Sequence, residues 1–231
     1  MHKIKALILD AGGVLVHPLL GNWNIPVKYR ELLGDYARDI NGEAWLEACR
    51  TEASLIREDI YIKDMEEEYG MRLAFLKAIA KRLNWALSEE TFAALAEDFT
   101  YNVTRYAWYE DSLPWLKQWH SRMQVGILSD AMPSFPHVVR SHEAHQYIHA
   151  LVVSTEIGTA KPDARMYLEI CRRLNAEPAE CLFVDDRVCN LEGAMNVGMR
   201  AVQMCRDGLE GWEGDKVHNL TELNHYLEGL N

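Results

Sequence analysis

Each of four short apolar runs in the chain is followed, directly or through a short loop, by a polar side chain that can bind phosphate or a metal ion. An apolar run that ends in a polar residue is typical of a buried strand whose last residue emerges at the edge of a sheet. In open parallel sheets, ligands bind at the carboxyl edge. We therefore expect these side chains to converge on one crevice. In chain order they are Asp10, Ser129, Lys161, Asp185 and Asp186.

The elements that would position these residues alternate from residue 109 onward. Patterns typical of amphipathic helices separate the apolar runs, and strands alternating with helices indicate a parallel sheet covered on both faces. The chain is thus predicted to fold as an α/β protein. The apolar runs are residues 6–9, 125–128, 151–153, 182–184 and 201–204, and the helical patterns include 113–119, 167–174 and 221–230.

Between Gly21 and Trp108 the sequence carries no strand signal. Apolar residues recur there at helical spacing in three stretches, 45–56, 71–79 and 92–103, and Ser88 suits the N-cap of the third. We therefore expect residues 17–108 to form a helical insertion after the first strand. The core domain would then comprise residues 1–16 and 109–231.

Composition limits the classes of partner. The 231 residues carry a formal net charge of −11, which disfavours nucleic acid and anionic membrane surfaces as partners, because both reward basic proteins. No stretch approaches the roughly 18 apolar residues of a membrane span. The five cysteines are scattered and include no Cys-x-x-Cys pair, which favours reduced thiols in the cytoplasm. A small-molecule substrate fits these properties.

The chemistry of the converging residues favours a divalent cation. Three carboxylates at close range repel one another and require a counter-charge. Oxygen ligands without a nearby histidine or cysteine favour a hard ion, most simply Mg²⁺. Asn190 lies one helical turn after Asp186 and is expected to hold a metal-bound water. The hydroxyl of Ser129 and the ammonium of Lys161 suit phosphate oxygens.

Four motifs in this chain together resemble those of the haloacid dehalogenase-like hydrolase superfamily. Their order and spacing match over nearly the whole chain, with the helical block in the position of that family's cap domain. The resemblance implies a Rossmann-like parallel sheet core with an inserted helical cap. The motifs are Asp10-Ala-Gly-Gly-Val-Leu, Ile-Leu-Ser129, Lys161-Pro-Asp-Ala-Arg-Met-Tyr, and Phe-Val-Asp185-Asp186 with Asn190-Leu-Glu-Gly-Ala.

The resemblance also implies roles for individual residues. Asp10 would be the nucleophile that forms an aspartyl-phosphate. Asp10, the carbonyl of Gly12 and Asp186 would hold Mg²⁺, and Asp185 would act on the metal largely through water. Covalent catalysis of this kind splits one difficult displacement into two easier ones.

The remaining implied roles concern the phosphoryl group. Ser129, Lys161 and Gly13 would bind it, and Lys161 would also stabilise charge during the transfer, together with the metal. The resemblance therefore implies a phosphatase that acts on a small phosphorylated metabolite.

Position 12 departs from the pattern of most phosphatases in the superfamily. They carry a second aspartate two residues after the nucleophile, which serves as general acid and base, whereas this chain has Gly12. Loss of such a group typically costs roughly 10²–10⁴-fold in rate. Good leaving groups suffer less, and these include sugar 1-phosphates, aryl phosphates and acyl phosphates. The chain also resembles the bacterial alpha-glucose-1-phosphatase-like branch, in which the same Asp-x-Gly opening occurs.

Asp130 is the second departure, because the family commonly has asparagine after the motif serine. We interpret Asp130 as a solvated turn residue that caps the following helix, in preference to a replacement acid. Two other features are assigned to the surface. The histidines between His137 and His149 include a pair, His145 and His149, that would share a helix face but lack a third zinc ligand, and the acidic run 64–68 reads as the exposed side of a helix.

The sequence as a whole predicts a Mg²⁺-dependent phosphatase, with a sugar phosphate among its candidate substrates. Two alternatives stay open. One is a catalytically weak phosphate-binding or regulatory protein, and the other is a 2-haloacid dehalogenase, which the pair Asp185-Asp186 disfavours because that chemistry needs no metal. The exact substrate, the pathway and the oligomeric state are not specified by the sequence.

Overall fold

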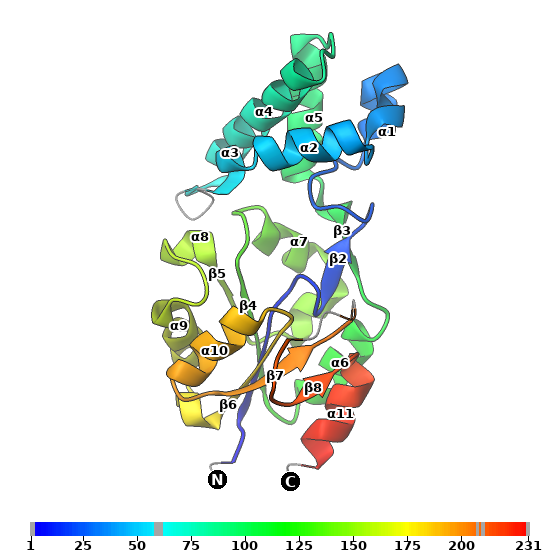
Figure 1. Ribbon diagram of the computed structural model, residues 1–231. Coiled ribbons are helices and arrows are strands. Elements are labelled where there is room, and N and C mark those ends of the chain that lie inside the picture. The colour runs from blue at the N-terminus through cyan, green and yellow to red at the C-terminus, as the bar shows by residue number, and fades with distance from the viewer. Residues whose placement is uncertain (1–2, 58–61, 207, 209–210, 230–231) are drawn as a thin grey trace. The chain divides into compact units, whose positions relative to one another are not determined.

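The computed structural model describes residues 3–57, 62–206, 208 and 211–229. The chain divides into two compact units, each of which is described by itself below (Figure 1). Unit 1 comprises Met1–His17, Ala107–Ala131 and Val139–Asn231, and unit 2 comprises Pro18–Tyr106 and Met132–Val138.

A parallel six-stranded sheet forms the centre of unit 1. Its strands lie in the order β5-β4-β1-β6-β7-β8, which is the 3-2-1-4-5-6 order of Rossmann-type folds when the sheet strands are counted along the chain. The predicted α/β fold is therefore confirmed. The strands are β1 (Ala6–Leu9), β4 (Gln124–Ser129), β5 (Ala150–Val153), β6 (Cys181–Asp185), β7 (Arg200–Met204) and β8 (Lys216–Val217).

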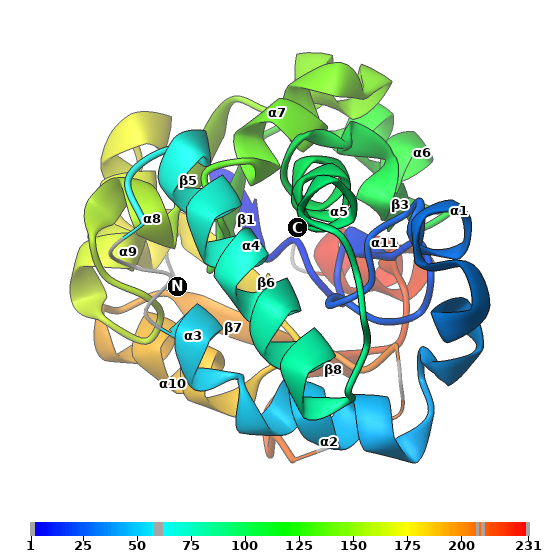
Figure 2. The same ribbon diagram turned by 90° about the horizontal axis from the view of Figure 1, so that it is seen from above.

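Helices cover both faces of this sheet. α9 and α10 pack on one face, α6 lies on the other, and α11 packs against α6 and β8, as Figure 2 shows from above. Tyr167, Ile170 and Leu174 of α9 are buried, which confirms their predicted helix face. The helices of this unit are α6 (Ser112–Trp119), α8 (Ser154–Ile157), α9 (Ala164–Leu174), α10 (Val188–Asn196) and α11 (Leu220–Glu228).

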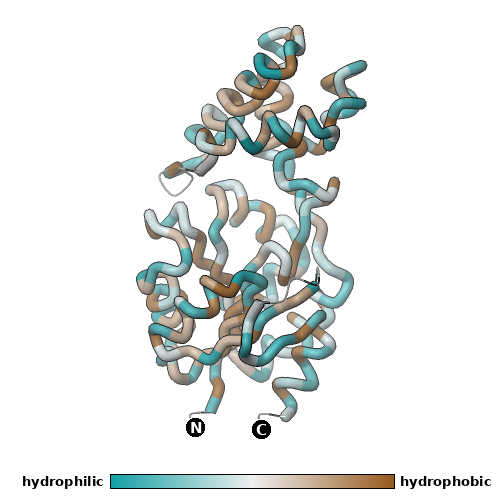
Figure 3. The backbone as a smooth tube through the Cα atoms, in the orientation of Figure 1, coloured by the Kyte–Doolittle hydropathy of each residue, from teal (hydrophilic) through white to brown (hydrophobic). Residues whose placement is uncertain are grey.

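The central strands of unit 1 are largely apolar because helices cover them from both sides. All four residues of β1 are buried, as are all five of β6. Figure 3 shows the middle strands of this unit as hydrophobic. Asp10, Ser129 and Asp185 come at the ends of β1, β4 and β6, and this places them at the carboxyl edge.

Unit 2 is largely helical. α4 and α5 pack along each other, and Phe75, Ile79 and Phe99 from these two helices form its core with Trp45 of α2. Ser88 caps α5 by accepting a hydrogen bond from the Thr91 N–H, as predicted. The helices are α1 (Tyr29–Leu33), α2 (Glu43–Thr51), α3 (Ser54–Arg57), α4 (Met65–Arg82) and α5 (Glu89–Tyr101).

The acidic run 64–68 is not entirely a solvated surface, and this corrects the sequence-based interpretation. Glu68 of α4 is fully buried. Its Oε2 accepts a hydrogen bond from the Ser134 N–H and its Oε1 accepts one from the Ser134 hydroxyl, each at 2.9 Å. Ser134 immediately precedes α7 (Phe135–Ser141). These bonds help to explain why 132–138 clusters with unit 2, although it lies outside the predicted insertion 17–108.

A second correction concerns strands. β2 (Val16–Pro18) and β3 (Tyr106–Trp108) pair in a two-stranded sheet, whereas the sequence predicted no strand between Gly21 and Trp108. Three residues are too few to show the alternation by which a strand is recognised. Within the described part of the chain, no helix is both long and apolar enough to cross a membrane.

Candidate active site

Asp10 stands at the carboxyl end of β1, in the middle of the sheet. β1 lies between β4 and β6, and the Asp10 N–H donates to the Val184 carbonyl of β6 at 2.8 Å. The chain order of the strands reverses at β1, since β4 and β5 lie on one side of it and β6, β7 and β8 on the other. Such a topological switch point is where open α/β sheets bind ligands.

The loop after Asp10 is a tight turn. The N–H groups of Val14, Leu15 and Val16 all donate to the Ala11 carbonyl, and the Gly13 N–H donates to the Val16 carbonyl at 2.9 Å. The bridge between positions 12 and 16 thus uses the groups of Ala11 and Gly13. The acceptors of these bonds are the carbonyls of Ala11 and Val16, and the Gly12 carbonyl takes no part in them.

Gly13 is required by two features of this turn. Its φ is +73°, a conformation that side chains with a Cβ rarely adopt. A Cβ atom on Gly13 would also lie only 2.8 Å from Oδ2 of Asp186. The backbone at Gly13 therefore lies so close to the Asp186 carboxylate that no side chain fits between them.

Lys161 supplies the positive charge at the centre of the site. Its Nζ donates to Oδ1 of Asp10 and to Oδ2 of Asp185, both at 2.7 Å, and to the Leu128 carbonyl at 3.2 Å. The side chain is 1% exposed. Burial opposes the charge, but the attraction of Asp10 and Asp185 outweighs it and raises the pKa of Lys161 above its ordinary value. The lysine therefore stays protonated.

Asp185 and Asp186 are adjacent but have different surroundings. Asp185 is fully buried and accepts hydrogen bonds from Lys161 Nζ, the Arg187 N–H and the Asn190 side-chain amide. Asp186 is half-buried. Asn190 had been expected to hold a metal-bound water, but its amide nitrogen donates to both oxygens of Asp185, at 3.1 and 3.0 Å. Asp185 is thus held by protein donors on both oxygens.

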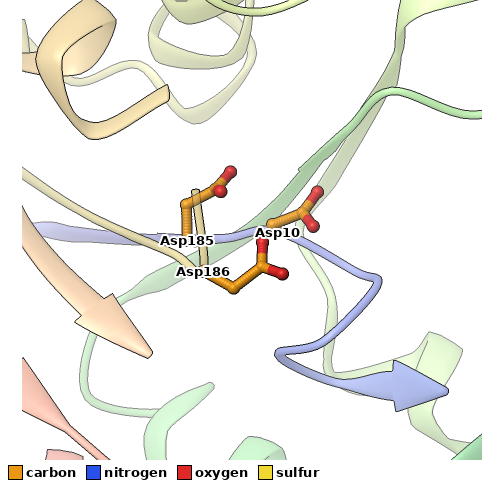
Figure 4. A group of neighbouring side chains, drawn as sticks. All are labelled: Asp10, Asp185 and Asp186. Carbon is orange, nitrogen blue, oxygen red and sulfur yellow. The ribbon is translucent and has the colours of Figure 1, made fainter. Parts of the chain in front are cut away.

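Asp10, Asp185 and Asp186 form a carboxylate cluster. One oxygen from each lies within 4.8 Å of the others, and Figure 4 shows the three side chains gathered where their strands end. Burial, and then the neighbouring Asp185, raise the pKa of Asp186 to about 6. Burial raises the pKa of Asp10 to about 7, against the opposing effect of Lys161. One lysine does not neutralise three carboxylates, so the cluster favours a divalent cation.

Ser129 is the last residue of β4 and is 5% exposed. β4 pairs with β1 in the register Leu9 to Ile127, and continuing this register sets Ser129 one position beyond the residue opposite Asp10. The serine predicted for phosphate binding therefore lies at the same edge of the sheet as the carboxylate cluster.

Asp130 does not have the surroundings that the sequence suggested. Its Oδ1 accepts the backbone N–H of Lys161 at 2.9 Å, and it is only partly exposed. Burial raises its pKa, while the charge and the N–H of Lys161 act to lower it. Asp130 therefore anchors the loop that carries Lys161, and the interpretation as a solvated helix cap is wrong.

The histidines between His137 and His149 do not gather around a metal position. His142 Nδ1 accepts the Ala144 N–H, and His149 Nδ1 accepts the Val125 N–H. His149 also lies beyond the short 3₁₀ helix Glu143–Tyr147 that contains His145, so the two do not share a helix face. Among the residues that the structure describes, the Asp10–Asp185–Asp186 group is the one cluster with the ligand arrangement of a metal site.

Comparison with known protein families agrees with the geometry of the site. A sequence model of haloacid dehalogenase-like hydrolases matches residues 4–198. The chain belongs to this family of hydrolases. Among curated proteins, it is 29% identical over 178 residues to a glyceraldehyde 3-phosphate phosphatase of Methanopyrus kandleri, and the match covers 74% of each chain.

Solved structures of haloacid dehalogenase-like proteins share the fold. A 2-haloacid dehalogenase of Pseudomonas syringae pv. Tomato aligns with a TM-score of 0.66 at 20% identity and covers 99% of this chain and 100% of its own. A haloacid dehalogenase-like hydrolase of Bacillus subtilis bound to magnesium aligns with a TM-score of 0.69 at 13% identity and covers 98% of this chain and 99% of its own. At these levels of identity the two similarities show that the fold is shared, in agreement with the family assignment.

One polar residue at the site was missed by sequence reasoning. Gln203 lies inside the apolar run of β7, is 2% exposed, and donates from Nε2 to the Asp186 carbonyl at 3.0 Å. A single polar residue within an apolar strand was the available signal, because a buried polar side chain needs a partner.

Proposed function

We propose that this haloacid dehalogenase-like hydrolase is a Mg²⁺-dependent phosphatase that acts on a small phosphorylated metabolite. The observation that carries the proposal is the carboxylate cluster of Asp10, Asp185 and Asp186 with Lys161 bonded to two of its members. An oxygen-only cluster with excess negative charge suits a hard divalent cation, and such a cation and a lysine together suit a phosphate dianion.

The donors that would hold Mg²⁺ can be assigned from their hydrogen bonds. Asp10 and Asp186 are the two carboxylates with free capacity, because Asp185 accepts protein donors at both oxygens. The Gly12 carbonyl would complete the set, since the turn at 11–16 does not use it. Bound there, Mg²⁺ would neutralise charge on the cluster and on the transferring phosphoryl group.

Asp10 is the proposed nucleophile. Its carboxylate oxygen forms a bond to phosphorus as the bond from phosphorus to the leaving oxygen breaks, which gives an aspartyl-phosphate and releases the alcohol after the leaving oxygen takes a proton. Water then attacks phosphorus, and the bond to Asp10 breaks to return the carboxylate and inorganic phosphate. Lys161 and Ser129 would bind phosphoryl oxygens throughout. The Gly13 N–H, to which the sequence assigned the same role, already donates to the Val16 carbonyl within the turn and is left out of this set.

The nature of residue 12 limits the substrate. Glycine there carries no acid, and Asp130 is bonded to the Lys161 backbone N–H, so it is held as a structural acceptor. The leaving oxygen must then take its proton from water, which favours substrates whose leaving groups are acidic. Among sugar phosphates, a sugar 1-phosphate is the class that we favour, because its anomeric oxygen is more acidic than an ordinary alcohol. The similarity to a phosphatase of glyceraldehyde 3-phosphate, whose leaving group is an ordinary alcohol, supports only a small phosphorylated substrate in general.

Unit 2 is proposed to be the cap that selects the substrate. It is inserted after β1, directly after the loop that follows the proposed nucleophile, and it has a hydrophobic core of its own. An inserted domain with its own core can differ between relatives while the residues at the strand ends stay the same.

The second candidate is a 2-haloacid dehalogenase, which the fold similarity to enzymes of that name favours. That reaction would use Asp10 on a carbon–halogen bond and would need no metal. The closeness of Asp186 to the Asp10 loop, which excludes a Cβ at Gly13, argues for the metal-dependent reaction.

A substrate screen separates the candidates. Phosphorylated metabolites and 2-haloacids are each supplied with Mg²⁺ and, separately, with a chelator, and phosphate and halide release are measured. We expect phosphate release that the chelator abolishes and that Asp10→Asn abolishes. Asp163→Asn is the matched control, because Asp163 caps α9 outside the cluster and asparagine caps helices equally well. Metal-independent turnover, or halide release alone, would refute the proposal.

A further inference from the structure

Gln203 holds the backbone of a proposed metal ligand. It lies on β7 opposite Asp185 in the sheet, and its Nε2 donates to the carbonyl oxygen of Asp186 at 3.0 Å. Its Oε1 accepts the Trp212 N–H at 3.3 Å. The side-chain amide therefore makes one hydrogen bond as donor and one as acceptor, and the two together set its orientation. The side chain is also buried, which leaves little room for another rotamer.

Arg206 holds the other ligand segment from the same end of β7. Its Nε donates to the carbonyl of Val14 at 3.0 Å, and its Nη2 donates to Oδ1 of Asp111 at 2.7 Å. The guanidinium carbon lies 3.9 Å from the centroid of the Tyr109 ring. Asp111 also accepts the Leu220 N–H at 2.9 Å. The arginine is thus braced on three sides while it holds the turn after β1.

The two segments so held are those that carry the proposed Mg²⁺ ligands. One is Asp186 itself, and the other is the turn that begins at Asp10 and contains Gly12. We propose that Gln203 and Arg206 are positioning residues that set the affinity for Mg²⁺ by fixing the separation of these segments. The inference rests on the proposed function, because it requires the carboxylate cluster to bind the metal.

The physical reason is preorganisation. Mg²⁺ demands near-ideal octahedral geometry. Ligands that are mobile before binding must be ordered when the metal binds, and this weakens the affinity. Residues behind the ligands typically contribute 10–100-fold to metal affinity. A methionine at position 203 has nearly the length of glutamine, and a methionine at position 206 ends where arginine has its Nε. Neither can donate to the Asp186 or Val14 carbonyl, so each segment would gain freedom.

The test measures metal binding without substrate. The full chain, freed of metal, is titrated with MgCl₂ in a calorimeter, and the dissociation constant is compared for wild type, Gln203→Met and Arg206→Met. We expect each substitution to weaken Mg²⁺ binding about 10-fold. Arg206→Lys keeps the charge but cannot hold a carbonyl and a carboxylate in the fork of a guanidinium, so it should also weaken binding.

Arg173→Met is the matched control. Arg173 lies in the same unit and likewise donates to a backbone carbonyl, Leu151 at 2.7 Å, and to a carboxylate, Glu156 at 2.6 Å, but its carbonyl partner belongs to β5. We expect this variant to lose thermal stability in chelator and to bind Mg²⁺ as wild type does. An equal loss of affinity in Arg173→Met would overturn the inference, because the effect would then be one of general stability.

The remaining outcomes are also decisive. Wild-type affinity in folded Gln203→Met and Arg206→Met would overturn the positioning role while leaving the proposed function intact. Absence of Mg²⁺ binding in the wild-type protein would instead overturn both. If a methionine variant lacks the wild-type circular dichroism spectrum, Gln203→Asn, whose amide is one methylene too short, and Arg206→Lys replace it with the same expectation.

Discussion

Nζ of Lys161 donates a hydrogen bond to Oδ1 of Asp10 at 2.7 Å, although the two residues are 151 positions apart in the chain. The same nitrogen lies 2.7 Å from Oδ2 of Asp185. The lysine therefore bridges the proposed nucleophile and a fully buried carboxylate, and its proposed role is to stabilise charge on a transferring phosphoryl group.

Replacing this lysine should remove catalysis. Lys161→Met leaves Asp10 and Asp185 without their shared cation, and we expect kcat to fall by at least about 10²-fold at saturating Mg²⁺, the usual cost of removing one charge-stabilising donor. Lys117→Met is the control, because Lys117 forms an ion pair with Glu143 at the surface. Steady-state kinetics provide the measurement, and near-wild-type kcat in Lys161→Met would contradict the assigned role.

Two glycines with similar φ, Gly13 in the turn after β1 and Gly21 in unit 2, separate the effect of backbone strain from that of contact with Asp186. Gly13→Ala should weaken Mg²⁺ binding by about 10-fold or more, because its Cβ would displace the Asp186 carboxylate. Gly21 has nearly the same φ, +74°, but no atom within 4 Å of the corresponding Cβ position. Gly21→Ala should therefore lower stability only. Metal titrations that give the two variants the same affinity would argue against the close approach.

Mg²⁺ binding should depend on pH because the metal displaces protons. Burial raises the pKa of Asp10 to about 7 and that of Asp186 to about 6, and metal ligands must be deprotonated. Affinity should rise as the pH increases from about 5.5 to 7.5, with proton release on binding. Calorimetry in buffers of different ionisation enthalpy measures the number of protons released, and pH-independent affinity would exclude this titration.

The same raised pKa affects the metal-free protein in the opposite direction. The pKa of Asp10 is about 7 in the folded protein, above its ordinary value of 3.8, so the folded chain holds this proton more tightly than the unfolded chain does. The resulting stabilisation is fully present below pH 3.8 and is lost as the pH rises through about 7. A tenfold difference in proton affinity between the folded and unfolded chains corresponds to roughly 1.4 kcal/mol. In chelator, the stability advantage of Asp10→Asn over wild type should therefore grow between pH 4 and pH 7. Thermal unfolding of both proteins across this range tests the sign.

Asp130→Asn should leave the shape of the pH–rate profile unchanged. Asparagine keeps the side-chain oxygen that accepts the Lys161 N–H, so the loop stays anchored and kcat should change only a few-fold. Asp130→Ala removes that acceptor and should lower activity further, since the loop carries Lys161. A limb lost from the profile of Asp130→Asn would instead identify Asp130 as the acid that Gly12 does not provide.

The missing acid can be restored in part. Gly12→Asp should speed hydrolysis of alkyl phosphates more than that of aryl phosphates, because good leaving groups need little protonation. Gly12→Asn, of the same size but without an acid, is the control. The ratio of kcat/KM for a matched alkyl and aryl substrate is the measurement, and equal effects on both substrates would contradict this account of Gly12.

The sequence by itself determined the fold class and the residues at the strand ends. A run such as residues 6–9 is buried on both sides because helices cover the sheet, so the first polar residue after it, Asp10, has to emerge at the edge. The same local logic places Ser129 and Asp185. These inferences need only hydrophobic periodicity and the geometry of parallel strands, both of which are properties of short segments.

Only the tertiary structure decided the partners of the remaining polar groups. Asp130 accepts the N–H of Lys161, the buried Glu68 accepts the N–H of Ser134, and Gln203 donates to the carbonyl of Asp186. Each of these contacts joins residues that are distant in the chain, and no periodicity in a single segment encodes which polar groups will meet. Side chains of the same type can be solvated or fully buried, because the available hydrogen-bond partners determine which environment is tolerated.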